Sequence, residues 1–202
     1  MSFLKKLFSS KRTEVWKQFG SEIGAEFIEG GFWKGDKVIK KFKVWTIVLD
    51  YYVHSNEGQH EYTRIRAPFI SKDKFRFTIY RKGFFSGIGK MLGMQDIEVG
   101  YPDFDRDFII KSNDEIKIRS LFANQKIREL IQAQPKMHLQ IKENKRGLFK
   151  KLPNEFTEIY FQEINIIKDI NRLKLLFSIF EEVLDYLCYL GSASKEDPHI
   201  NL

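Results

Sequence analysis

The chain has 202 residues, of which 43% are hydrophobic and 30% charged, and its formal net charge is +7. A chain of this length holds one large or two small domains with a sizeable core, and its composition is typical of a globular protein. The one cysteine, Cys188, excludes an intramolecular disulfide and a cysteine-based zinc site. No apolar run is long enough to span a bilayer, and the sequence does not begin like a secretory signal peptide, which predicts a cytoplasmic protein.

The first twelve residues, MSFLKKLFSSKR, are rich in apolar and basic side chains and contain no acidic one. This composition is typical of an amphipathic segment that lies on an anionic membrane surface. A helix of about two to three turns is only marginally stable in water, so a lead-in to the first helix of the domain is the favoured alternative. We treat residues 1–12 as a separate basic segment. The side chains that would contact a membrane are Phe3, Leu4, Lys5, Lys6, Leu7 and Phe8.

The next part of the chain predicts one helix and three strands. Apolar residues at helical spacing predict a helix over 13–27. Alternating apolar residues predict strands over 44–53, 63–70 and 75–81. The short turn-forming segments between these strands favour a three-stranded antiparallel meander. Together with the strand described next, these strands supply the predicted core residues Trp45, Ile47, Leu49, Ile65, Phe69, Phe75, Phe77, Phe108 and Ile110.

The middle of the chain predicts a short helix, a strand and a helix pair. Residues 83–94 predict a glycine-punctuated short helix with one apolar face, and residues 104–111 predict a strand. Ser112 and Glu115 match the S-x-x-E capping box at the start of a helix. Asn124 is the predicted cap of a second helix.

Two further strands and a long helix complete the predicted domain. The strands cover 137–141 and 158–164, and the last helix covers 166–190. This element order predicts a single α+β domain over 13–190. Its antiparallel sheet of about six strands is packed against an N-terminal helix, a central helix pair and the long C-terminal helix. The polar residues 191–202 predict a flexible tail.

Apolar residues of the last helix step by three and four positions, as in a coiled-coil seam. Such a seam suits an unknown protein partner or self-association through this helix. Leu176, Val183 and Leu190 widen the stripe, which favours packing on the domain's own sheet with only an edge left for a partner. The seam residues are Ile166, Ile170, Leu173, Phe177, Phe180, Leu184 and Leu187.

None of the usual chemical motifs is complete in this sequence. Phe84 stands where a phosphate-binding loop needs glycine, and Met91 stands where that loop needs serine or threonine. The acidic run that starts at Asp103 has Phe108 where a calcium loop needs glycine. We therefore predict no metal, no cofactor and no catalytic residue. Basic residues are mixed with acidic ones throughout, so nucleic-acid binding is not expected either.

Charged residues on the outward faces of the predicted strands form a candidate ligand site. Unpaired arginines would suit a phosphate or carboxylate, which an arginine binds in a bidentate manner. Arginines paired with neighbouring aspartates would form a surface network instead, and the matching spacing favours this pairing. The residues concerned are Arg64, Arg66, Arg76, Asp105 and Asp107.

Three segments resemble uncharacterised bacterial proteins of the domain-of-unknown-function kind: WTIVLD from Trp45, YTRIRAPF from Tyr62 and FDRDFIIK from Phe104. The resemblance covers roughly residues 14–190 and implies a bacterial cytosolic protein, with no function or site attached.

Two functional classes remain open from the sequence. The first is a non-catalytic binding or scaffold module, which acts on a protein partner or at the inner membrane face. The second is a small anionic-ligand-binding protein, or an enzyme, that uses the polar sheet face. A pocket where the arginines converge would favour the second class, and a salt-bridged face would favour the first.

Overall fold

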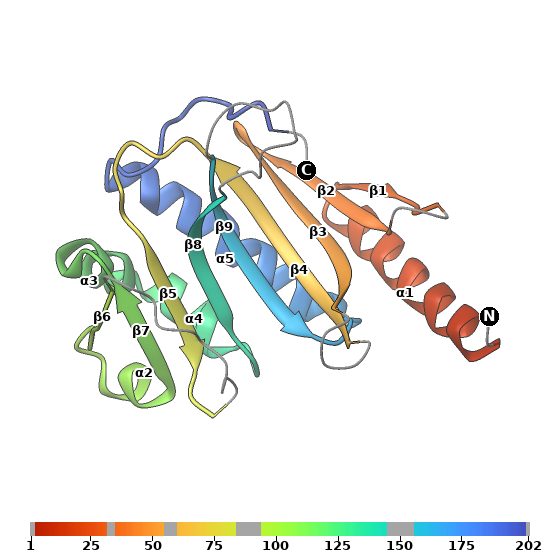
Figure 1. Cartoon of the computed structure of the whole chain (residues 1–202), viewed down its shortest axis with the longest axis horizontal. Helices are drawn as coiled ribbons and strands as arrows, with labels where there is room; N and C mark the ends of the chain where they lie inside the picture. Colours follow the sequence, from red (N-terminus) through yellow and green to blue (C-terminus); the bar gives the residue numbers. More distant parts are fainter. Residues whose placement is uncertain (1–2, 32–34, 55–59, 84–93, 145–155, 201–202) are drawn as a thin grey trace.

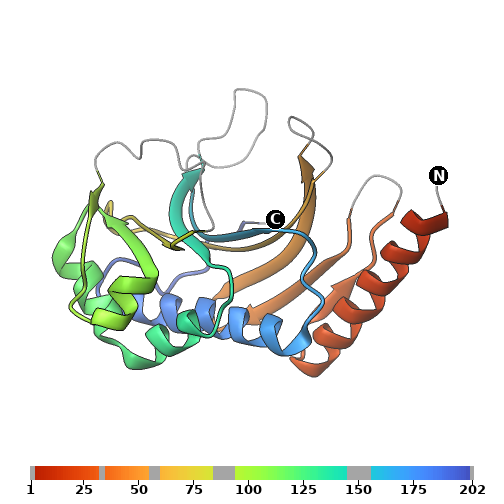
Figure 2. The same ribbon diagram turned by 90° about the horizontal axis from the view of Figure 1, so that it is seen from below.

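The computed structural model describes residues 3–31, 35–54, 60–83, 94–144 and 156–200, which form a nine-stranded sheet with helices packed on one side (Figures 1 and 2). The strand order is β1-β2-β3-β4-β9-β8-β5-β7-β6, and each neighbouring pair is antiparallel. The strands are β1 Glu26–Ile28, β2 Lys37–Phe42, β3 Trp45–His54, β4 His60–Phe69, β5 Phe77–Arg81, β6 Gln95–Asp96, β7 Phe108–Ser112, β8 His138–Asn144 and β9 Phe156–Ile164.

The α+β class with an antiparallel sheet is confirmed, but the predicted number of about six strands is wrong. The described residues contain three strands that the pattern did not predict, β1, β2 and β6. β1 and β6 are three and two residues long, too short to show an alternating pattern. β2, KVIKKF, has three lysines among its six residues, and these interrupt the alternating apolar pattern by which a strand is recognised. All three strands lie at or next to an edge of the sheet, where less of each strand is buried.

The predicted meander is also wrong in its third strand. β3 pairs with β4 as expected, but β4 pairs next with β9, and β5 lies beyond β8. The residues between β4 and β5 therefore form a crossover rather than a hairpin turn. This arrangement decides which charged side chains meet, because Arg64 and Arg76 are separated by two strands that come late in the sequence.

Five helices lie in the described residues: α1 Phe3–Glu22, α2 Pro102–Asp107, α3 Glu115–Ala123, α4 Gln125–Gln132 and α5 Ile170–Tyr189. Figure 2 shows α1, α4 and α5 along one side of the sheet, while the sheet curves around its opposite side, on which no described helix lies. The first helix ends at Glu22 rather than near Phe27, because Gly24 adopts a positive φ of 64° and the chain turns into β1.

The segment around Phe104 differs from the strand predicted over 104–111. Proline at the first helical position and two aspartates in the first turn favour a helix start, and residues 102–107 form α2 before β7 begins at Phe108. The predicted capping box is wrong as well. The N-cap of α3 is Asp114, whose carboxylate accepts a hydrogen bond from the Lys117 N–H at 3.0 Å. Asn124 caps α4 as predicted.

The predicted core is confirmed on the helix-covered side of the sheet. All nine predicted strand residues are buried, and so are eight residues of α5. Five of these eight buried residues are members of the predicted seam. Phe19 of α1 packs edge-on against Phe177 of α5, with ring centroids 5.0 Å apart. The α5 stripe therefore packs on the chain's own sheet.

The start of the predicted tail belongs to the folded body. Ser192, Ala193 and Ser194 are buried, and Ala193 forms a β-bridge with Ser71. The short helix predicted over 83–94 falls almost entirely on residues 84–93, outside the described part of the chain.

Candidate binding surfaces

The side of the sheet without a described helix carries a polar network, which we call the helix-free face. Arg64 of β4 donates two hydrogen bonds of 2.7 Å, from Nε and NH2, to the carboxylate of Asp50 on β3. Arg66 donates a third, of 2.8 Å, to the same carboxylate. Asp50 is only 4% exposed, so both arginines serve as its counterions. Alternation along the strands puts these three side chains on one face, and the β3–β4 register puts Asp50 directly opposite Arg64.

A second part of the helix-free face is aromatic. The hydroxyls of Tyr52 and Tyr160 both donate to the side-chain oxygen of Gln162, at 3.0 and 2.9 Å. Tyr52 also stacks on Tyr62, with ring centroids 5.0 Å apart. The Gln162 amide nitrogen lies 3.5 Å from Nδ1 of His138. The tyrosine rings, the Gln162 amide and the His138 imidazole thus fix one another's positions across four strands.

The third part of this face is an ion pair on the central strands. Lys142 Nζ of β8 lies 3.6 Å from the Glu158 carboxylate of β9 and 3.4 Å from the centroid of the Tyr160 ring. Glu158 is 1% exposed, and its Oε2 has no hydrogen-bond partner among the described residues. The Lys142 ammonium is partly buried, and this burial lowers its pKa, although the negative charge of Glu158 acts in the opposite direction.

Burial shifts the pKa of two groups on this face. Burial, together with the positive charge of Lys142, lowers the pKa of His138 to about 4, so the imidazole is neutral at neutral pH. Burial also raises the pKa of the Tyr160 phenol. None of the hydrogen bonds described above for this face joins a nucleophile to a base.

The five predicted site residues do not form one cluster, although Arg64 and Arg66 lie together on Asp50. Arg64 and Arg66 pair with Asp50, as described, whereas Arg76 pairs with Glu143 of β8 at 3.4 Å. The Asp105 carboxylate accepts hydrogen bonds of 2.8, 2.9 and 3.0 Å from three successive backbone N–H groups that precede α2. Asp107 pairs with its neighbour Arg106 at 3.0 Å and with Arg81 of β5 at 3.4 Å.

The predicted pairing of Arg64, Arg66 and Arg76 with Asp105 and Asp107 is therefore wrong. Residues 102–107 form a helix rather than a strand. In the sheet, β9 and β8 lie between β4, which carries Arg64 and Arg66, and the strands β5 and β7. The partner that the alternating pattern does support, Asp50, precedes the arginines by about one strand and one turn. Its position opposite Arg64 in the predicted hairpin is the signal that could have identified it.

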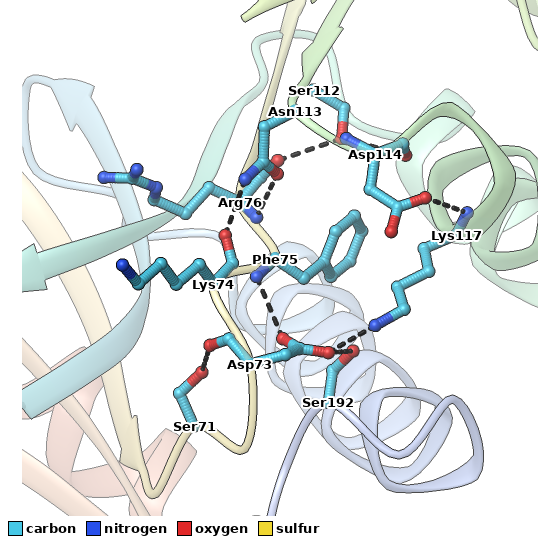
Figure 3. Close-up of polar contacts among 10 residues, drawn as sticks. All are labelled: Ser71, Asp73, Lys74, Phe75, Arg76, Ser112, Asn113, Asp114, Lys117 and Ser192. Carbon is cyan, nitrogen blue, oxygen red and sulfur yellow. Dashed lines mark hydrogen bonds and ion pairs between the residues drawn. The ribbon is translucent and has the colours of Figure 1, made fainter. Parts of the chain in front are cut away.

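The backbone of Arg76 lies at a structural junction (Figure 3), where its N–H donates to the Asn113 side chain at 2.8 Å. There the Asp73 carboxylate accepts hydrogen bonds from the Phe75 N–H at 2.9 Å and the Ser192 hydroxyl at 2.8 Å, and it also binds Lys117. Burial favours the protonated acid, but these three donors outweigh it and lower the pKa of Asp73. Figure 3 shows the Arg76 side chain extending away from this cluster. The junction joins the β4–β5 crossover to α3 and to the segment after α5.

A cavity lies where α5 ends, and we call it the α5-end cavity. It has a volume of 520 Å³. Its walls come from the β2–β3 turn, the last turns of α5 and the segment that follows α5. The lining residues are Lys43, Val44, Trp45, Asp185, Cys188, Tyr189 and Lys195. Sequence reasoning missed this cavity because its walls are distant in the sequence and share no pattern.

The predicted membrane contact through residues 3–8 stays a prediction, because the structure describes only their helical backbone. One residue of the basic segment has a different place. Arg12 is 7% exposed, pairs with Asp36 at 3.2 Å and lies over the Tyr51 ring, so it belongs to the folded body. No helix in the described residues is long and apolar enough to cross a membrane. Within those residues we also find no cluster of three or more His, Cys, Asp or Glu side chains suited to a metal ion.

Comparison with known proteins gives a fold neighbour. No family model and no curated protein matches the sequence. Among solved structures, the chain resembles the crystal structure of the mycobacterial trehalose monomycolate transport factor A, TtfA, with a TM-score of 0.55 and 8% sequence identity. The match covers 91% of this chain and 98% of that one. At this identity the likeness concerns the fold, and the two chains share it over nearly their whole length.

Proposed function

We propose that this chain is a non-catalytic binding module and that its helix-free face is the surface that contacts a protein partner. The supporting observation is the network in which Asp50 holds Arg64 and Arg66 while Gln162 holds two tyrosines. These groups are fixed by one another on a continuous sheet, and none of them is arranged as a nucleophile with its base.

Pre-organisation is what suits this face to binding. A flexible surface loses side-chain entropy when a partner orders it, and that loss weakens the complex. Here the guanidinium and phenol groups are already held by hydrogen bonds of 2.7–3.0 Å. Tyrosine and arginine are also the residue types enriched among the side chains that dominate protein interfaces. The exposed parts of Tyr52, Tyr62 and Arg64 therefore offer a rigid contact surface.

The fold neighbour supports an accessory role. TtfA is described as a transport factor. The present chain has the same fold over nearly its full length, and a non-catalytic helper is the corresponding proposal for it.

A second candidate, binding of a small anion on the same face, has one observation in its favour. Arg64, Arg66 and Lys142 are three cations, and their counterions on this face are the carboxylates of Asp50 and Glu158. We rank it second because both arginines already share a carboxylate, which an incoming anion would have to displace or approach from outside.

The test of the proposal is a comparison of matched surface variants in affinity capture from cells that produce the protein. Tyr62→Glu combined with Gln140→Glu changes half-buried residues of the helix-free face. Lys126→Glu makes a similar charge change on the exposed surface of α4. We expect the wild type and Lys126→Glu to retain a specific protein that the face variant loses, with all three equally folded by circular dichroism. Identical captured proteins for all three would refute the proposal.

The anion alternative has its own readout. Phosphate or a carboxylate would raise the melting temperature of the wild type in a saturable manner and would not raise that of Lys142→Gln. Such a result would favour the second candidate over the first.

A further inference from the structure

The α5-end cavity differs from the helix-free face in position and in chemistry. It lies at the end of the helical layer, between the β2–β3 turn and the segment after α5. Its volume of 520 Å³ is within the range of sites that bind small molecules. Its walls combine apolar and charged side chains, which is the usual character of such sites.

The charge around the cavity is positive. Lys43 is held by Asp185, with Nζ 2.6 and 2.7 Å from the two carboxylate oxygens. Lys195, which also lines the cavity, forms no ion pair with any described residue. Lys72 is close enough to act electrostatically on Cys188 and likewise has no ion-pair partner in the described part of the chain. Asp185 is thus the single acidic residue of the lining, against two lining lysines and a third nearby.

A buried donor adds a second, independent observation. Trp45 lines the cavity, is 2% exposed, and has an indole N–H without an acceptor among the described residues. The buried indole of Trp16, by contrast, donates to the Ile167 carbonyl at 3.0 Å, as buried donors in folded proteins almost always do. The missing acceptor at Trp45 is the kind of group that a bound molecule supplies.

The apolar part of the lining includes an accessible ring. Tyr189 is 78% exposed, an unusual degree for an aromatic residue, and its ring lies against that of Tyr186 with centroids 5.3 Å apart and an interplanar angle of 54°. Val44 lines the cavity from the β2–β3 turn. A planar apolar group that enters the cavity would cover part of the Tyr189 ring.

We propose that the α5-end cavity binds a small organic anion with a flat apolar part, of the class of aromatic carboxylates and aryl phosphates. The anionic group lies at Lys195 and Lys43, an oxygen of the molecule accepts from the Trp45 N–H after a small adjustment of the indole, and the ring contacts Tyr189. This site is separate from the helix-free face, so it stands or fails independently of the proposed function.

The single cysteine gives a direct measurement, because Cys188 lines the cavity and is the one thiol of the chain. We would measure its alkylation rate by iodoacetamide with benzoate, phenyl phosphate, benzamide or inorganic phosphate present. The two aromatic anions are expected to slow alkylation severalfold and in a saturable manner. Uncharged benzamide and ringless phosphate are expected to leave the rate nearly unchanged. Ligand-observed NMR of the same four compounds provides a readout that does not depend on thiol reactivity.

Matched variants locate the effect. Lys195→Gln removes the unpaired cation and should abolish protection, whereas Lys126→Gln, which lies outside the cavity on α4, should retain it. Trp45→Phe keeps an aromatic ring but removes the N–H, and it should weaken binding. Three results would each overturn the proposal: no protection and no NMR broadening by either aromatic anion, equal protection by benzamide, or full protection in Lys195→Gln. Should Trp45→Phe fail to fold, the pair of lysine variants still decides.

Discussion

The two faces of the central sheet are built from the same strands but are held by different interactions. On the helix-covered face, Ile47, Ile65 and Phe161 are completely buried among other apolar side chains. On the opposite face, their sequence neighbours include Arg64, Arg66 and Gln162, which are held by directed hydrogen bonds. Apolar packing tolerates any neighbour of suitable shape, whereas a buried charge needs a particular partner. The helix-free face should therefore be more sensitive to pH and to the loss of one partner.

The largest expected effect is on the helix-covered face. Phe77→Ala removes a fully buried ring that contacts Phe122 edge-on, with centroids 6.2 Å apart. We expect it to lower the free energy of unfolding by about 4 kcal/mol, as for other large-to-small core changes. Urea denaturation measures this loss, and Ile116→Ala, at an 83% exposed position, is the control. An unchanged midpoint for Phe77→Ala would show that the two faces have been assigned the wrong way round.

The second effect tests whether the helix-free face depends on paired charges. Arg64→Ala combined with Arg66→Ala leaves the buried Asp50 carboxylate without either counterion. We expect a loss of about 3 kcal/mol, and adding Asp50→Asn should restore part of it because the stranded charge is removed. Arg106→Ala, in an exposed pair, should cost little and serves as control. Equal denaturation midpoints for the double variant and the wild type would contradict the pairing.

The third effect concerns pH. The pKa of His138 is lowered from 6.5 to about 4 by burial and by Lys142, so the unfolded chain takes up a proton at a higher pH than the folded one. The neutral imidazole contributes to the free energy of unfolding above pH 6.5, and this contribution is lost as the pH falls from 6.5 towards 4. Its full size is about 3 kcal/mol.

The matched variant for this effect is His138→Gln, which cannot titrate. Guanidinium denaturation of both proteins at pH 7.5, 6, 5 and 4 should show the wild type losing more stability than the variant on acidification. Parallel pH profiles for the two proteins would rule out His138 as the cause.

The smallest effect is a single pair on the helix-free face. Tyr52 and Tyr62 stack with an interplanar angle of 10°, and offset aromatic pairs contribute about 1 kcal/mol beyond the area they bury. A double-mutant cycle with Tyr52→Leu and Tyr62→Leu should give a coupling energy of this size. A coupling energy near zero would mean that stacking of Tyr52 on Tyr62 does not stabilise the fold.

Alternation and helical spacing predicted those elements in which the environment is uniform along the chain. β3, β4 and α5 were found because each presents a regular apolar side to one core. α2 was missed because Phe104, together with Phe108 at the start of β7, also fits a strand pattern, while the local signal of Pro102 and the following aspartates favours a helix start. β2 was missed because its lysines interrupt the apolar pattern.

The candidate site was harder to predict because it depends on strand order. The sequence places Arg64, Arg66 and Arg76 on outward faces, but only the sheet shows that β9 and β8 lie between the first two and the third. Asp50 and Arg64 are in one hairpin, so their pairing follows from local register. The partners of Arg76 and Asp107 come from elements brought together by long-range packing, which local patterns do not determine.

The strand order has a consequence for synthesis of the chain. β4 and β5 are consecutive in the sequence, yet the hairpin of β8 and β9, which is made much later, lies between them and pairs with both. A nascent chain that has just completed α4 thus carries two unpaired strand edges in the middle of the future sheet, and such edges are prone to pair with other chains. A chain released from the ribosome before residue 164 should aggregate or be degraded. In the complete chain, β8 and β9 pair with the free edges of β4 and β5.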